Sequence, residues 1–171
     1  MNAKKWALIA LFSFFCAGNT FAQSADADKE AAVVEIGAAA NWSVKNGGSS
    51  FGPNFAVEVT PIEHWLEIEA GVTPLFADHS TEWDVDCLFK KPWTFTKKIE
   101  FMAGAGPEWI HTSVRGVTTN SAAAEAALDF MFWPLAKHRF GWYLEPAYDY
   151  SFGRGHEQSA GISGGLLIAI P

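Results

Sequence analysis

A histidine, a serine and a glutamate are spaced in a way that could support acyl transfer. His111 and Ser113 are two residues apart, and Glu125 follows fourteen residues after His111. A serine activated by a histidine, which an acid in turn orients, is the arrangement used in many acyl-transfer enzymes. A three-residue match arises easily by chance. An acyl hydrolase is therefore one hypothesis, which the positions of these residues in the fold must test.

Three histidines lie in separate polar stretches near acids. If His79, His111 and His156 converged, their imidazoles could bind a transition metal. No spacing such as HxxxH links them, and that kind of spacing marks many metal sites. We therefore expect no metal and no cofactor.

The carboxylates show the strongest regularity. In "WLEIEAGV", residues 65–72, Glu67 and Glu69 alternate with Leu66, Ile68 and Ala70. Successive side chains of a strand point to opposite faces, so this alternation predicts a strand with one polar and one apolar face.

The same alternation recurs along the chain and predicts eight strands. Their residues are 34–45, 54–60, 66–73, 82–90, 98–106, 124–132, 141–150 and 159–170. Between them, "IEHW", "KKPWTFT" and "PLAKHR" are compact, whereas "KNGGSSFG", "ADHST", "HTSVRGVTTNS" and "SFGRGHEQ" are polar. An even number of alternating segments with short periplasmic turns and longer outer loops is typical of outer-membrane barrels. The predicted fold class is all-β, an eight-stranded antiparallel up-and-down transmembrane β-barrel.

A soluble exported barrel of the lipocalin type would show a similar alternation, so the composition of the two faces decides. No charged residue of the predicted strands falls on the apolar face, and the polar face is rich in acids and small residues. A solvated surface mixes both signs of charge, so we favour a membrane barrel with the polar face inside. The predicted lumen acids are Glu35, Glu58, Glu67, Glu69, Glu100, Glu125, Asp129 and Glu145, and the predicted lumen cations are Lys90 and Lys98.

Tryptophans supply an independent indication of the membrane. All seven that follow residue 22 lie near the ends of predicted strands: Trp42, Trp65, Trp83, Trp93, Trp109, Trp133 and Trp142. Interfacial aromatic girdles occupy these positions in membrane barrels. We therefore predict that all seven belong to the girdles.

The N-terminal residues predict export. Lys4 and Lys5 precede a short apolar run and then small residues up to Ala22, which is the pattern of a cleaved signal peptide. The predicted organisation is a signal peptide at 1–22, a short periplasmic tail at 23–31 and the barrel at 32–171. A net charge of −7 without a basic stripe argues against a nucleic acid partner.

On this pattern the chain resembles the small outer-membrane β-barrel proteins of Gram-negative bacteria, including the barrel of outer membrane protein A. The resemblance covers residues 32–171 and implies location in the outer membrane, contact with its lipid and lipopolysaccharide, and insertion by the barrel-assembly machinery. The chain ends in "LLIAIP", where the family usually has a final aromatic residue. His111, Ser113 and Glu125 also resemble the catalytic residues of the lipid A deacylases, but those lie close to the C-terminus, whereas these lie mid-chain.

These observations favour a structural or surface-interaction role with an acidic, filled lumen and no catalysis. A narrow porin-like conduit for cations or small solutes is the first alternative, and a lipid A deacylase is the second. The partner of the outer loops is not indicated by any residue pattern.

Overall fold

The computed structural model describes residues 31–135 and 139–171, and all regular structure in them is β-strand. The predicted signal peptide at 1–22 and most of the predicted tail at 23–31 lie outside the described residues. Within the described ranges, no helix is long and apolar enough to cross a membrane.

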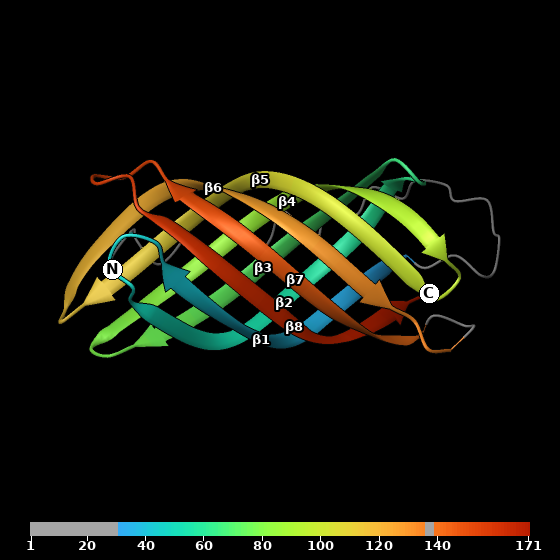
Figure 1. Ribbon diagram of the computed structural model, residues 1–171, viewed down its shortest axis with the longest axis horizontal. Coiled ribbons are helices and arrows are strands. Elements are labelled where there is room, and N and C mark those ends of the chain that lie inside the picture. The colour runs from blue at the N-terminus through green and yellow to red at the C-terminus, as the bar shows by residue number, and fades with distance from the viewer. Residues whose placement is uncertain (1–30, 136–138) are drawn as a thin grey trace, which may run out of the picture.

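Eight strands form one closed antiparallel barrel (Figure 1). Each strand pairs with the next along the chain, and the first pairs with the last over its whole length. This arrangement confirms the predicted fold class. The strands are β1 (Ala32–Ser43), β2 (Ser49–Ile62), β3 (Leu66–Ala77), β4 (Ser80–Thr96), β5 (Ile99–Val114), β6 (Val117–Phe132), β7 (Phe140–Ser151) and β8 (Gln158–Ile170).

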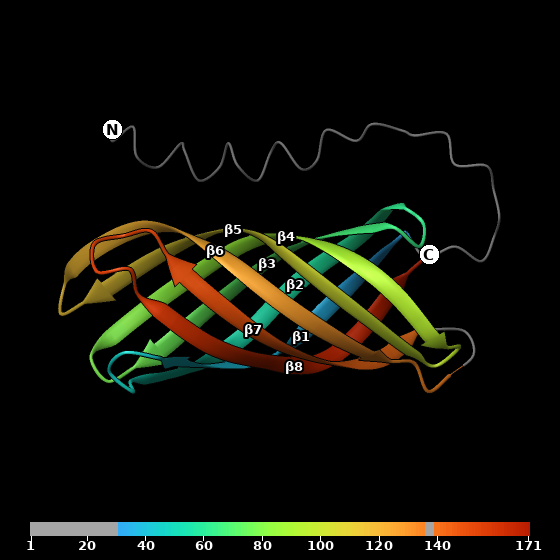
Figure 2. The ribbon, with the colours of Figure 1, turned by 45° about the horizontal axis from the view of Figure 1, so that its top comes forward.

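The two ends of the barrel differ in what they carry. The start of β1 and the end of β8 lie together at one end, which we call the terminal end (Figures 1 and 2). The connections 63–65 and 97–98 lie at this end, and so do the end of β6 at Phe132 and the start of β7 at Phe140. The other four connections, 44–48, 78–79, 115–116 and 152–157, lie at what we call the far end.

The predicted difference in loop length between the two ends is wrong. At the far end, β5 and β6 continue to a turn at Arg115 and Gly116, so the stretch 111–121 forms a hairpin where a long loop was predicted. Both turn residues have positive φ, 49° and 84°, as a two-residue hairpin turn of type I′ requires. At the terminal end, the expected turn 90–96 is strand, and the turn falls at 97–98. Beyond the predicted ends, inward and outward side chains still alternate, but many of them are polar or aromatic. A search for alternating apolar residues therefore ends these strands too early.

The two faces of each strand meet different environments. On β1, Ile36 is 44% exposed and the adjacent Glu35 is 1% exposed. On β2, Val57 is 44% exposed and the adjacent Glu58 is 1% exposed. An apolar exterior around a polar interior is the arrangement of membrane barrels and the reverse of a soluble barrel.

One lysine of the described strands lies on the exterior face, just beyond the predicted strand 82–90 to which the predicted sorting of charge applied. Lys91 of β4 is near the terminal end, and its Nζ donates a hydrogen bond to the carbonyl oxygen of His64 at 2.6 Å. A lysine close to a strand end can extend its ammonium group to the membrane interface while its methylene groups remain in the apolar layer.

Six of the seven tryptophans lie exposed on the exterior, between 44% and 59%: Trp42, Trp65, Trp83, Trp93, Trp109 and Trp142. Trp133 is the exception and the girdle prediction is wrong for it, because its side chain is 2% exposed. It packs inside the terminal end with Met102, Met131, Tyr143 and Leu167. It follows β6 directly, on the same alternation as Met131, so its side chain turns inward to close the barrel.

Candidate functional site

In the described part of the chain, the interior contains one buried cation, which lies within a group of acids. Lys90 of β4 is 1% exposed, and its Nζ lies 2.5 Å from Glu69 Oε2 and 3.3 Å from Asp129 Oδ2. It also forms an ion pair with Glu145. These three acids come from β3, β6 and β7, so one ammonium group on β4 links four of the eight strands. We call Lys90 and these three acids the Lys90 network.

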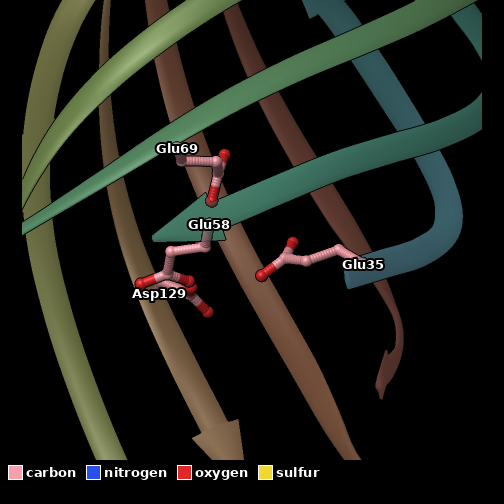
Figure 3. Close-up of side chains that lie close together, drawn as sticks. All are labelled: Glu35, Glu58, Glu69 and Asp129. Carbon is pink, nitrogen blue, oxygen red and sulfur yellow. The ribbon is translucent and has the colours of Figure 1, made fainter. Parts of the chain in front are cut away.

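Two further acids, Glu35 and Glu58, adjoin the Lys90 network. Figure 3 shows Glu35, Glu58, Glu69 and Asp129 extending from four strands toward the same part of the interior. Carboxylate oxygens of these four residues lie within 4.8 Å of one another. Glu58 lies directly opposite Glu69 across β2 and β3, a position in which like charges destabilise a sheet. The ammonium group of Lys90 offsets this repulsion.

A glycine provides the space for Lys90. Gly104 of β5 lies directly opposite Lys90, and a Cβ at Gly104 would lie 2.6 Å from both Lys90 Cγ and the carbonyl oxygen of Phe89. Any larger residue would displace the lysine side chain or the neighbouring strand.

A second polar chain crosses the interior beside the Lys90 network. The hydroxyl of Tyr143 donates to Asn54 Oδ1 at 2.5 Å, and Asn54 Nδ2 donates to Thr73 Oγ1 at 2.8 Å. Gly37 lies under the tyrosine, because a Cβ at Gly37 would lie 2.6 Å from its hydroxyl oxygen. This chain connects β7, β2 and β3 through groups that are all buried.

The remaining predicted lumen residues divide between two cavities. Glu67 and Glu100 line a cavity of about 190 Å³ at the terminal end, together with Glu58. Glu125 lines a cavity of about 60 Å³ toward the far end. The prediction for Lys98 is wrong, because β4 extends to Thr96 and so Lys98 falls in the exposed turn that follows.

Four acids that were not among the predicted lumen acids also line the far-end cavity: Asp84, Asp86, Glu108 and Asp149. Three of them fall on the polar face of predicted strands, so alternation already indicated an inward position. Glu108 was missed because the predicted strand ended at residue 106, although it continues the phase of Glu100. Extending each alternation by a few residues would have found it.

The residues of the acyl-transfer hypothesis do not come together. Glu125 lines the interior cavity, whereas His111 and Ser113 are on the exterior phase of β5. His111 Nδ1 is 2.8 Å from Asn120 Oδ1, and its ring stacks on Trp109 with centroids 5.6 Å apart. An acid on the opposite face of the sheet cannot orient this histidine.

The loop histidines have separate local roles. His156 lies in the connection between β7 and β8, where its Nδ1 is 3.2 Å from the hydroxyl of Tyr150. His79 occupies the tight turn between β3 and β4 with a φ of 61°. Within the described residues, the groups with metal-binding geometry consist of carboxylates, and none contains a histidine.

Comparison with known proteins finds solved structures of the same fold, but no matching family model or curated protein. Neisserial surface protein A is similar in structure, with a TM-score of 0.68 and 14% sequence identity, over 82% of this chain and 97% of that chain. Ail, the attachment invasion locus protein of Yersinia pestis, has a TM-score of 0.56 and 13% identity, over 83% and 100%. The N-terminal β-barrel domain of Pseudomonas aeruginosa OprF has a TM-score of 0.53 and 12% identity, over 80% and 97%.

These identities are too low to transfer a function, but the shared architecture covers nearly the whole of each neighbour. It agrees with the closed eight-stranded sheet described above. The chain has the fold of the small eight-stranded β-barrels of the bacterial outer membrane.

Proposed function

We propose that this protein is a structural outer-membrane barrel with a sealed interior, which presents its far end to the outside of the cell as an interaction surface. The observation that carries the first part is the Lys90 network, which joins β3, β4, β6 and β7 across the interior. The observation that supports the second part is the extended hairpin of β5 and β6.

The packing of the interior supports a barrel that does not conduct. Leu88, Met102 and Leu167 are 0% exposed, and Lys90 is 1% exposed. The far-end cavity and the terminal-end cavity have no lining residue in common. Eight-stranded barrels are just wide enough for side chains to fill, so these fully buried side chains favour an interior without a continuous path between the two cavities.

The far end supports a surface role. A spanning strand needs about 9–11 residues, whereas β4, β5 and β6 have 17, 16 and 16. The excess extends β5 and β6 beyond an apolar layer as a hairpin with a polar sequence, from His111 to Ser121. Residues 114–120 of this hairpin are all exposed. The names of two solved neighbours describe a surface protein and an attachment protein, which agrees with a surface role for such an end.

Conductance in planar bilayers tests the sealed interior. The protein, purified from membranes in detergent, is inserted into a bilayer, with a wide porin as positive control and a heat-modifiability gel to show that it is folded. The proposal predicts no stepwise current. Reproducible cation-selective steps from folded protein would favour the alternative function, a narrow conduit for cations.

Labelling of intact cells tests the orientation. Thr119→Cys lies on the far-end hairpin and Thr96→Cys at the terminal end, and both positions are exposed. A membrane-impermeant maleimide should label the first variant in intact cells and the second only after the cells are lysed, with the parent protein as control for Cys87. Labelling of Thr96→Cys alone in intact cells would reverse the assignment of the outer surface.

A further inference from the structure

The far-end cavity is lined by several acidic side chains and by no basic side chain of the described residues. Of the residues that the structure describes, seven carboxylates line it, and no lysine, arginine or histidine does. Two of the seven, Glu69 and Glu145, are ion-paired with Lys90. The other five form what we call the far-end acid cluster: Asp84, Asp86, Glu108, Glu125 and Asp149.

The strand register forces these acids against one another. Asp86 lies directly opposite Glu108 across β4 and β5, and Glu125 lies directly opposite Asp149 across β6 and β7. Like charges in directly opposite positions of a sheet are destabilising. Two such pairs face the same small cavity, so the repulsion is relieved only if some of these acids are protonated or if a positive charge lies among them.

Hydrogen bonding within the protein leaves part of this cluster unsatisfied. Glu108 is 6% exposed and its Oε2 has no hydrogen-bond partner, and Asp84 is 8% exposed and its Oδ1 has none. Both side chains line the cavity. A buried carboxylate oxygen without a donor is costly, so these oxygens indicate a ligand that the polypeptide does not provide. Oxygens of Glu35, Glu58 and Asp129 near Lys90 also have no hydrogen-bond partner, but those acids have an ammonium group among them.

Three of the acids have the spacing of a cation site. One carboxylate oxygen from each of Glu108, Glu125 and Asp149 can be chosen so that all three lie within 4.8 Å of one another. Ca²⁺ binds oxygen at about 2.3–2.6 Å, so two oxygens on the same ion are at most about 5 Å apart. We propose that Glu108, Glu125 and Asp149 bind one hard divalent cation of the Ca²⁺ class in the far-end cavity.

The chemistry of the donors selects the class of ion. The ligands are oxygens on three different strands, and hard cations such as Ca²⁺, Mg²⁺ and Mn²⁺ prefer oxygen, whereas Zn²⁺ and Cu²⁺ prefer sites that include nitrogen or sulfur. Asn41 adds a neutral oxygen, because its Oδ1 is buried, has no partner and lines the same cavity. Ca²⁺ accepts a flexible geometry with six to eight ligands, which suits side chains fixed by a barrel wall.

Calorimetric titration with CaCl₂ tests the site directly. The protein is purified from membranes in detergent, freed of lipopolysaccharide and treated with a chelator that is then removed. The test variant is Glu108→Gln with Glu125→Gln, which keeps the size of both side chains and removes their charge. The matched control is Glu157→Gln, an acid in the exposed connection between β7 and β8, outside the cavity.

We expect saturable binding of one Ca²⁺ per chain to the parent and to Glu157→Gln, and at least tenfold weaker binding to the double variant. Thermal unfolding gives a second readout that does not depend on heat signals. In chelator, the double variant should unfold at a higher temperature than the parent, because two like charges are removed. Added Ca²⁺ should raise the unfolding temperature of the parent and leave that of the double variant unchanged.

The proposal is overturned if the parent shows no saturable Ca²⁺ binding at millimolar concentration. It is also overturned if the double variant, folded by the heat-modifiability gel, binds as tightly as Glu157→Gln. If the double variant does not fold, the single variant Glu108→Gln takes its place, and Ca²⁺ binding as tight as that of Glu157→Gln then overturns the proposal, since Ca²⁺ bound at the acids around Lys90 would not be weakened by this change.

Discussion

Replacing Lys90 by methionine removes the only ammonium group of the Lys90 network and keeps a side chain of similar length. At an effective dielectric constant of about 20, attraction across 2.5 Å and 3.3 Å is worth about 7 and about 5 kcal/mol. Desolvation of the buried charges offsets most of this, and breaking a buried ion pair by removing one partner costs about 3–5 kcal/mol. We therefore expect Lys90→Met to lower the free energy of unfolding by about 3–5 kcal/mol.

Urea unfolding in lipid vesicles, followed by tryptophan fluorescence, measures this loss. Lys45→Met is the matched control, since Lys45 is exposed beyond the end of β1, and a surface change of this kind stays within about 0.5 kcal/mol. Adding Glu69→Gln, Asp129→Asn and Glu145→Gln to Lys90→Met should restore most of the loss, because neutralising a whole buried ion group is often nearly neutral in stability. If Lys90→Met unfolds at the same urea concentration as the parent, the idea that this lysine holds the interior together is refuted.

Two further substitutions test the packing of the interior by the same urea titration. Trp133→Ala should lower the free energy of unfolding by about 3–5 kcal/mol, as expected for a buried large side chain. Trp142→Ala should lower it clearly less, because the side chain of Trp142 is 59% exposed. Equal losses would contradict the inward position of Trp133. Gly104→Ala should lower the free energy of unfolding by about 1–3 kcal/mol through overpacking against Lys90. Gly161→Ala is the control and should be tolerated, since a Cβ there would meet no atom closer than 3.7 Å. A tolerated Gly104→Ala would show that the lysine side chain can move aside.

Alternation predicted the strands because a barrel wall separates lipid from a polar interior at every second residue. Glu35 and Glu69 were expected inside on that ground, and they are buried. The strand ends were harder to predict, since beyond the apolar layer both faces of a strand can be polar. For this reason the stretch 111–121 was expected as a loop, and Lys98 was expected in the lumen although it lies in a turn.

Contacts between strands far apart in sequence were beyond prediction. Nothing in the sequence links Lys90 to Asp129 or Glu145, since those contacts depend on which strands face one another across the closed barrel. Trp133 was expected in the lipid interface because it lies near a strand end, and a single sequence does not reveal whether a terminal side chain turns outward or closes the interior. The far-end acid cluster likewise depends on register, which places Glu125 opposite Asp149.

Contact between lipid chains and neighbouring leucines tests most directly whether this is a membrane barrel with its polar face inside. Leu166 and Leu167 are adjacent on β8, with exposures of 45% and 0%. With methyl-labelled leucine in lipid nanodiscs, nuclear Overhauser effects from acyl-chain protons should reach the methyl groups of Leu166 and not those of Leu167. Effects at Leu167 alone would mean that the register is shifted by one residue, and their absence at both leucines in folded protein would mean that the apolar exterior does not face lipid.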